Sequence, residues 1–282
     1  MLNKYDKIDM HIHSTASDGT FEPKNILEEI KFKNIKLFSL TDHDSYENVE
    51  KLKELVLEED THFIPGVEVS SLYKGELFHI LAYGTNNSNK NFTNILMNNR
   101  RQLEEKDDNS IKYLIDKGYN IEYKDYESYI HNPQRGGWKA LNFLIDNKMC
   151  EDVSDYFSRV FAGNVDMKSP VFENTVNVVD AIKGAGGIPV LAHPYYINID
   201  VDADKRLGML YELGIEGVEC YHPNHSKERT EQCITWCKKN DIIITAGSDC
   251  HGNFIPSRKI GMMNVSVEQA NLKNLIQYLQ EP

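Results

Sequence analysis

Short apolar runs that end in a histidine or an acidic residue recur along this chain, and an amphipathic helical pattern follows most of them. Clear cases are residues 8–13, 36–44, 187–193, 217–222 and 242–251. Strands that alternate with helices form largely parallel sheets. Polar residues at the carboxyl ends of many such strands favour a closed barrel over an open sheet. We therefore expect an α/β fold in which a (β/α) barrel carries the functional residues at its mouth.

This pattern stops between residues 91 and 170. Residues 95–115 have the spacing of one or two charged helices, and residues 139–149 have the spacing of another. We interpret residues 91–170 as a mainly helical insertion that caps the barrel mouth, with residues 1–90 and 171–282 forming the barrel domain. A continuation of the barrel through the insertion is the alternative interpretation.

The bulk properties limit the partners and the location of the protein. No stretch approaches the roughly 20 apolar residues that a membrane-spanning helix needs, and the first residues lack the apolar core of a secretory signal. We therefore expect a cytoplasmic protein without a membrane partner, and no pattern predicts its oligomeric state. The formal net charge of −12 argues against stable nucleic-acid binding through a basic surface. An anionic substrate remains compatible, because bound divalent cations reverse the local charge.

Residues that can bind metal gather at the ends of the predicted strands. His11 and His13 are two positions apart, so both rings project from the same strand face and could converge on one cation. Two histidines on one strand are also common as ordinary polar surface. The remaining candidates are Asp18, His43, Glu68, His79, His193, Asp249 and His251. Separate structural roles do not account for the whole set, and mixed imidazole and carboxylate ligands in this number indicate more than one divalent ion.

Five motifs resemble, in the same order, those of the PHP (polymerase and histidinol phosphatase) family. They are HIHSTASDGT at residues 11–20, TDHD at 41–44, GVEVS at 66–70, LAHP at 191–194 and GSDCHG at 247–252. The resemblance implies a distorted seven-stranded (β/α) barrel with a trinuclear metal site. It is nearest to small-molecule phosphoesterases of the family, including nucleoside 3′,5′-bisphosphate phosphatases.

The resemblance also implies a grouping of the ligands around three ions. One ion would be held by His11, His13, Glu68 and Asp249. Glu68 would bridge to a second ion, held also by His79 and His193. The third would be held by Asp18, His43 and His251. Two or three divalent ions are therefore expected, and the ligand types suit Mn, Fe and Zn alike.

Metal ions lower the pKa of bound water from about 15.7 towards 7, so a metal-bound water would be the nucleophile. We expect hydrolysis of a small-molecule phosphate ester, either a nucleotide or a sugar or alcohol phosphate. A metal-dependent hydrolase of an amide or acyl bond is one alternative, although no lysine ends a predicted strand as a bridging ligand. A non-catalytic PHP-type binding module is the other.

Several residues outside the metal set are candidates for substrate contacts. Arg135 precedes two glycines and a helix, Lys168 ends the insertion, and both could bind phosphate. His222 lies past a predicted strand end and could bind phosphate or act as the general acid. Each also fits an ordinary role as a solvated or loop residue. Three aromatic residues could stack on a base or sugar, or simply pack: Trp138, Tyr195 and Tyr196.

Overall fold

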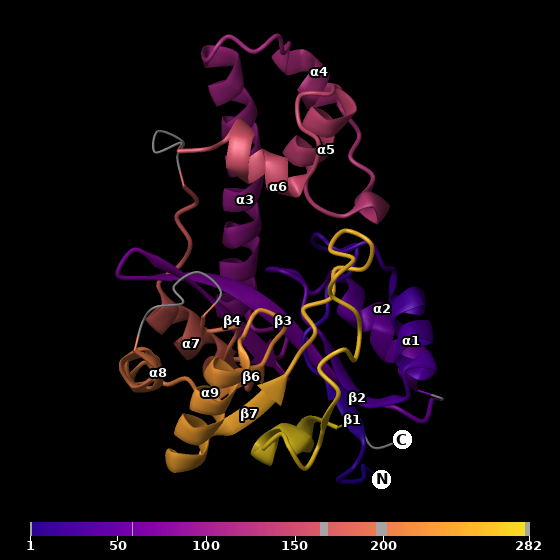
Figure 1. Ribbon diagram of the computed structural model, residues 1–282, viewed down its shortest axis with the longest axis vertical. Coiled ribbons are helices and arrows are strands. Elements are labelled where there is room, and N and C mark those ends of the chain that lie inside the picture. Colours follow the sequence, from indigo (N-terminus) through magenta and orange to yellow (C-terminus); the bar gives the residue numbers. More distant parts are fainter. Residues whose placement is uncertain (1, 58, 164–168, 196–201, 280–282) are drawn as a thin grey trace.

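A single twisted sheet of eight strands forms the centre of the structure, a computed structural model that describes residues 2–57, 59–163, 169–195 and 202–279 (Figure 1). The strand order is β7-β6-β5-β4-β3-β2-β1-β8. The strands are β1 (Lys7–Asp9), β2 (Ile35–Leu40), β3 (His62–Tyr73), β4 (Glu76–Tyr83), β5 (Ile188–Leu191), β6 (Gly217–Tyr221), β7 (Ile243–Ala246) and β8 (Val265–Ser266). Seven strands were expected, and the additional one, β8, is a two-residue strand antiparallel to β1.

The sheet nearly closes where the residues that follow β1 meet the end of β7 and the residues beyond it. The N–H of Met10 donates to the carbonyl of Ala246 at 2.8 Å, and the N–H of Asp249 donates to the carbonyl of His11 at 2.9 Å. Ile12 and Cys250 form an isolated parallel bridge. The barrel is therefore nearly closed. The contacts that close it involve the motifs at residues 11–20 and 247–252, which both contain predicted ligands.

Most neighbouring strands are parallel, as expected, but β4 runs antiparallel to both β3 and β5. The reason is the two-residue turn of Lys74 and Gly75, which have φ angles of 50° and 81°. Two positive φ angles in succession form the kind of tight turn that joins antiparallel strands. This reversal is the main distortion of the parallel barrel.

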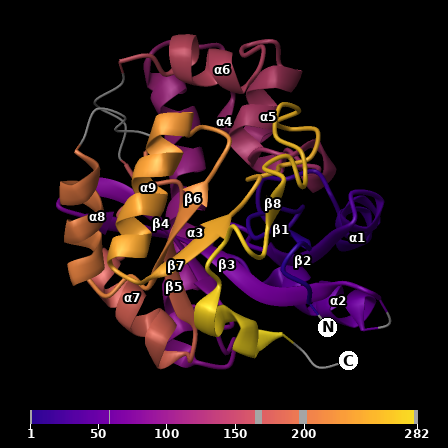
Figure 2. The same ribbon diagram turned by 60° about the horizontal axis from the view of Figure 1, so that its bottom comes forward.

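Helices cover the outside of the sheet on both sides (Figure 2). They are α1 (Pro23–Phe32), α2 (Glu47–Val56), α7 (Thr175–Gly184), α8 (Ala203–Glu212) and α9 (Lys227–Lys239). The side chains of Asn174 and Ser226 accept hydrogen bonds from the first turns of α7 and α9, which fixes where these helices start. A 3₁₀ helix, η3 (Lys273–Tyr278), follows β8.

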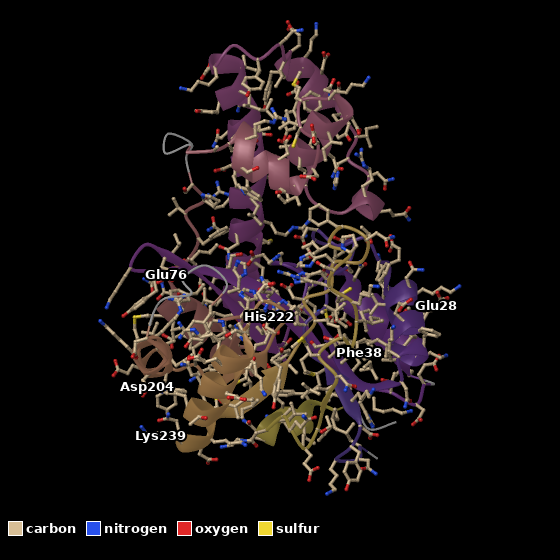
Figure 3. All side chains as sticks on the ribbon, in the orientation of Figure 1. Glu28, Phe38, Glu76, Asp204, His222 and Lys239 are labelled. Atoms are coloured by element: carbon tan, nitrogen blue, oxygen red, sulfur yellow. The ribbon has the colours of Figure 1, made fainter. Side chains whose placement is uncertain are left out.

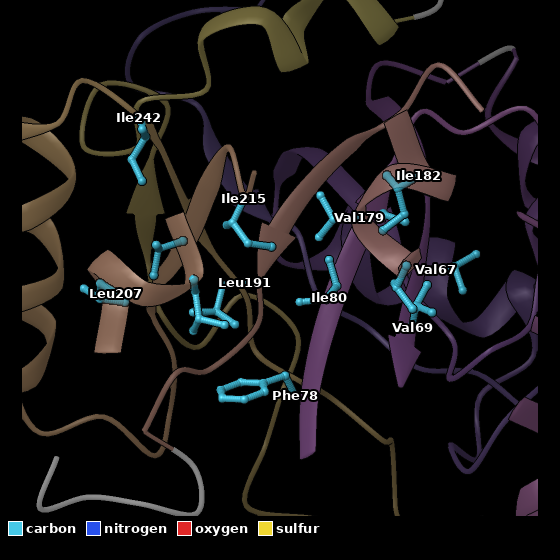
Figure 4. Close-up of a cluster of buried hydrophobic side chains, with 14 of the residues drawn as sticks. Val67, Val69, Phe78, Ile80, Val179, Ile182, Leu191, Leu207, Ile215 and Ile242 are labelled. Carbon is cyan, nitrogen blue, oxygen red and sulfur yellow. The ribbon is translucent and has the colours of Figure 1, made fainter. Parts of the chain in front are cut away.

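Side chains alternate between two cores along the strands. Leu81, Val190 and Ile243 pack inside the barrel, whereas their neighbours in sequence pack outward against α7, α8 and α9. Figure 4 shows the outer core, with Ile80 of the sheet near Val179 of α7, and Leu191 near Leu207 of α8. Full burial of each such side chain contributes about 1.5–3 kcal/mol. Because both faces of these strands are buried against apolar side chains, consecutive strand residues are apolar, and the strands appear in the sequence as continuous apolar runs.

The segment after β4 forms a helical extension at one end of the long axis (Figure 1). It comprises α3 (Lys90–Asp116), α4 (Tyr123–Ser128), η1 (Pro133–Arg135), α5 (Lys139–Asp146), α6 (Val153–Asp155) and the π-helix η2 (Tyr156–Val160). These helices have their own hydrophobic cluster, which includes Ile111, Leu141 and Tyr156. Among the described residues, no helix combines the length and the apolarity needed to cross a membrane.

Candidate metal centre

All nine predicted metal ligands lie together at the mouth of the barrel. Each comes from the end of a strand or the loop beyond it, apart from Glu68 and His79, which lie within β3 and β4. Figure 3 labels the neighbouring His222 in the middle of the barrel, with Glu28 and Lys239 far out on the covering helices. The carboxyl ends of the parallel strands meet at this mouth, and the antiparallel β4 brings His79 to it from the first half of the strand.

Four ligand atoms surround one point deep in the mouth. Oε2 of Glu68 lies 3.1 Å from Nε2 of His11 and 3.2 Å from Nε2 of His13. Oδ1 of Asp249 lies 3.1 Å from Nε2 of His13, and the two histidine Nε2 atoms are 3.1 Å apart. Ligands bound at about 2.0–2.2 Å to one ion lie roughly 3–3.5 Å from each other. The four atoms therefore have the spacing of a single coordination shell.

The other oxygen of Glu68 faces a second group. Its Oε1 lies 2.9 Å from Nδ1 of His79 and 2.9 Å from Nε2 of His193. Nδ1 of His43 lies 3.2 Å from Oε2 of Glu68, the oxygen that also faces His11 and His13. One carboxylate thus has different histidines on its two oxygens, as a residue between two ions would.

A third group surrounds Asp18. Its Oδ1 lies 3.3 Å from Nε2 of His251 and 3.8 Å from Nδ1 of His13, and its Oδ2 lies 4.0 Å from Nε2 of His43. Ligand atoms within 4.8 Å of one another form three overlapping sets. They are His13, Asp18, His43 and His251; His11, His13, Glu68 and Asp249; and His43, Glu68 and His79.

The donor set fits divalent cations. Nδ1 of His13, Oδ1 of Asp18 and Nδ1 of His79 are buried and have no hydrogen-bond partner. A buried polar atom without a partner costs about 1–3 kcal/mol. Each of these atoms points at other ligand atoms rather than at a donor or acceptor with suitable geometry, and a bound cation would satisfy all three.

The electrostatics of the cluster follow from burial and mutual contact. Burial opposes charge on Glu68, but the adjacent histidines, His11 above all, outweigh it and hold the pKa of Glu68 well below its usual value. Burial lowers the pKa of His43 to about 3 despite the neighbouring carboxylates. His43 is therefore neutral near neutral pH, which is the state that binds metal.

Two residues that were not predicted from the sequence contact the predicted ligands on the side that faces away from the ligand cluster. Glu219, in the middle of β6, places Oε1 2.9 Å from Nδ1 of His11. Arg258 pairs with Oδ2 of Asp249 and is buried. A carboxylate within an apolar strand was an available signal for Glu219, because an unpaired buried charge is costly. Arg258 lies in an irregular loop, where the sequence offered no signal.

His222 and Arg135, two of the residues predicted to contact substrate, differ in their surroundings. His222 is buried, with Nε2 3.1 Å from Oδ2 of Asp249. Arg135 donates to Asp146 at 2.7 Å and to the hydroxyl of Tyr129 at 3.1 Å. Lys168 and Tyr196 lie outside the described residues. The roles of His222, Arg135 and Lys168 in substrate binding remain predictions.

A cavity of about 560 Å³ connects the metal cluster with the helical extension. Asp18, His43 and His79 line it on the barrel side. The opposite wall contains aromatic and basic residues: Trp138, Phe157, Phe172, Arg100, Lys106 and Lys139. Tyr195 is not in this wall, because it is buried beneath the guanidinium of Arg229, 4.8 Å from its ring centroid.

Solved structures share this fold. A protein of Bifidobacterium adolescentis described as a metal-dependent phosphoesterase matches with a TM-score of 0.78 at 23% identity, over 96% of this chain and 94% of that one. An amidohydrolase of Chromobacterium violaceum matches with a TM-score of 0.80 at 21% identity, over 98% of each chain. These likenesses confirm the predicted fold class, a distorted (β/α) barrel with a helical segment, though with eight strands instead of seven.

Curated relatives align along most of the chain. A 5′-3′ exoribonuclease of Haemophilus influenzae is 24% identical over 253 residues, 89% of this chain and 91% of that protein. A phosphoribosyl 1,2-cyclic phosphate 1,2-diphosphodiesterase of Eggerthella lenta is 25% identical over 257 residues, 87% of this chain and 94% of that one. A 3′,5′-nucleoside bisphosphate phosphatase of Chromobacterium violaceum is 23% identical over 257 residues, 90% of each. All three are named for cleaving phosphate ester bonds.

The PHP domain, as a family profile, matches residues 9–167, which are 159 of the 282 residues. The matched region contains the first six predicted ligands, from His11 to His79, and continues through the helical extension. Because this match spans more than half of the sequence, the chain belongs to the PHP-domain family, as its motifs predicted.

Proposed function

We propose that this chain hydrolyses a small phosphate ester in the cavity between the barrel mouth and the helical extension, using two or three divalent ions. Hydrolysis of phosphoric esters is the activity that the three curated relatives have in common. The observation that carries the proposal is the meeting of nine imidazole and carboxylate ligands, several of them buried without hydrogen-bond partners, at one end of this cavity. Manganese, iron and zinc all suit this ligand set.

The nine ligands would form three metal-binding sites, two of which share Glu68. His11, His13, Glu68 and Asp249 would hold one ion, Glu68 with His79 and His193 a second, and Asp18 with His43 and His251 a third. When bound, such ions supply a nucleophile from water near neutral pH and offset charge on the phosphoryl oxygens. Asp18, His43 and His79 line the cavity itself, so the scissile phosphate would bind against these three.

His222 is the proposed general acid. Its Nδ1 accepts a hydrogen bond from the backbone N–H of Asn224 at 3.1 Å, so the proton of the neutral ring lies on Nε2. Nε2 faces Oδ2 of Asp249, at the inner edge of the ligand cluster. For this step His222 must start as the imidazolium: the Nε2 proton passes to the departing alkoxide oxygen, the ring becomes neutral, and a proton from solvent then restores the imidazolium.

The far wall of the cavity supports a nucleotide-like leaving group. Nζ of Lys106 lies 5.4 Å from the ring centroid of Trp138, which places a cation and a flat aromatic surface together. Burial lowers the pKa of Lys106, in keeping with a position away from bulk water. A flat ring with an additional anionic group complements these two side chains. Single nucleotides have both features.

The domain division proposed from the sequence gives the extension a function. In this view, residues 1–90 and 171–282 supply the metal ligands, and residues 91–170 supply the aromatic and basic wall of the cavity apart from Phe172. Arg135 and Lys168 would then contribute from the same segment if they contact phosphate. Differences in this wall would change the preferred ester while the reaction stays the same.

The proposal is tested with Asp249→Ala and Glu68→Gln, compared with Asp180→Ala, which changes an exposed carboxylate on α7. Phosphate release would be measured on a sugar phosphate, a nucleoside monophosphate, a nucleoside 3′,5′-bisphosphate and a short 5′-phosphorylated RNA. Metal content would be measured by elemental analysis. We expect the first two variants to lose activity and bound metal while circular dichroism stays unchanged. Full activity in either variant would refute the proposal.

A further inference from the structure

We propose that Glu219 is a positioning residue that fixes two metal ligands from different strands, the ring of His11 and the backbone of His193. This inference rests on the metal centre proposed above. Glu219 is fully buried in the middle of β6, which lies between β7 and β5, the strand that leads to His193. It belongs to none of the three ligand sets found among the described residues, so Glu219 would contact the ligands without binding a metal ion itself.

The first contact sets the tautomer of His11. Oε1 of Glu219 lies 2.9 Å from Nδ1 of His11. An ionised carboxylate only accepts hydrogen bonds, so Nδ1 must carry a hydrogen, and the neutral ring that metal binding requires must present its lone pair at Nε2. Nε2 is the atom that lies 3.1 Å from both Glu68 and His13. Glu219 therefore directs the metal-binding nitrogen of His11 at the cluster.

The second contact holds His193 in an unfavourable backbone conformation. The N–H of His193 donates to Oε2 of Glu219 at 3.0 Å. The φ angle of His193 is 22°, in a region that side chains with a Cβ rarely adopt and that costs about 1–3 kcal/mol. A charge-assisted hydrogen bond at this N–H offsets that cost. The ring of His193 is thereby kept with Nε2 2.9 Å from Oε1 of Glu68.

The local packing leaves space for this arrangement only at a glycine. A Cβ atom added to Gly247 would overlap both Cβ of His11 and Oε1 of Glu219. Gly247 begins the GSDCHG motif, so the motif provides room for Glu219 as well as two ligands. Because the two oxygens of Glu219 serve ligands of two different predicted ions, we expect its loss to weaken both.

The decisive variant is Glu219→Gln, which keeps the shape but leaves one acceptor oxygen for two N–H donors. Its matched control is Glu216→Gln, which removes the same charge just before the same strand, where Glu216 pairs with Lys183 at 3.2 Å. Mn²⁺ affinity would be measured by calorimetry on the full-length protein after chelation. Loss of an outer partner of a metal ligand lowers metal affinity about 10–100-fold. We expect that loss for Glu219→Gln and none for Glu216→Gln.

A second measurement keeps the inference testable if Glu219→Gln does not fold. The ¹⁵N chemical shifts of the His11 ring in the Zn²⁺-loaded natural protein report its tautomer. We expect hydrogen on Nδ1 and metal on Nε2, and hydrogen on Nε2 would refute the inference. Unchanged Mn²⁺ affinity in a folded Glu219→Gln variant would refute it too, even if the melting temperature fell. Metal binding without any phosphate release by the natural protein would instead refute the proposed function alone.

Discussion

Nε2 of His222 lies 3.1 Å from Oδ2 of Asp249, and this contact gives the two oxygens of the carboxylate different partners. Oδ2 also accepts from Arg258, whereas Oδ1 lies 3.1 Å from Nε2 of His13. Asp249 is thus held by proton donors on one side and presented to the ligand cluster on the other. A fixed carboxylate of this kind loses little freedom when it binds a cation.

The proposed acid role of His222 predicts a dependence on the leaving group. For His222→Gln we expect kcat to fall about 100-fold with an alkyl phosphate, the usual scale of general acid catalysis. With p-nitrophenyl phosphate, whose leaving group needs no protonation, the loss should be several times smaller. Steady-state kinetics with both esters measures this difference. An equal loss with both would mean that His222 only positions Asp249.

The cavity wall predicts a role for Lys106 in binding. Lys106→Met should raise KM about tenfold for a nucleoside 3′,5′-bisphosphate and leave kcat nearly unchanged, because the lost contact is with the leaving group. Lys112→Met is the matched control, since Lys112 also lies on α3 over an aromatic ring, with Nζ 5.0 Å from the centroid of Tyr123, but outside the cavity wall. Equal kinetics for the two variants would remove Lys106 from the substrate site.

Metal binding should release protons. Burial lowers the pKa of His13, but contacts with Asp249 and Glu68 outweigh it and raise this pKa to about 10. Burial is likewise outweighed at His11 by the carboxylates of Glu219 and Glu68, which raise its pKa well above the usual value. Both rings are therefore protonated near neutral pH and must lose a proton to bind a cation.

Calorimetry of Mn²⁺ binding at about pH 7.5 in HEPES and in Tris tests this proton release. The two buffers have different heats of ionisation, so the apparent enthalpies should differ in proportion to the protons released. His11→Asn should reduce the difference. The same enthalpy in both buffers would show that the rings are already neutral and that the cluster does not exchange protons for metal.

The clustering of the candidate ligands was predictable because its signal is local. His11 and His13 share a strand face, and Asp249 and His251 stand at another strand end, so alternation and barrel topology place them at one mouth. Arg135 illustrates the opposite case. Its partner, Asp146, lies eleven residues later at the end of α5, and no sequence spacing revealed this ion pair.

The antiparallel course of β4 and the contacts of Glu219 were not predicted, for two different reasons. The course of β4 depends on the φ angles of Lys74 and Gly75, and the strand pattern alone does not distinguish a hairpin from a crossover. Glu219 contacts a residue 208 positions away, through a pairing that only the closed barrel creates. Periodicity predicts which residues form a strand, but it does not predict which side chains of distant strands contact each other.

The helical extension contains a buried carboxylate that should make stability depend on pH. Asp107 on α3 accepts a hydrogen bond from the N–H of Ala140 at 3.2 Å, at the start of α5. Burial raises the pKa of Asp107 to about 7 from 3.8. The folded protein therefore keeps this proton where the unfolded chain has lost it. The stabilisation is complete below about pH 4 and is lost as the pH rises towards 7, because the unfolded state binds fewer protons in that range.

Asp107→Asn should remove this dependence, because its amide oxygen can accept from Ala140 without ionising. We expect the melting temperature of the variant to equal that of the natural protein near pH 4 and to exceed it by several degrees at pH 8. Asp116→Asn, at an exposed position on the same helix, controls for the change in net charge and should show no such divergence. Thermal unfolding followed by circular dichroism across this range gives the result. If Asp107→Asn were less stable than the natural protein at pH 8, the ionised carboxylate would be stabilising the start of α5, and burial would not be the dominant influence on it.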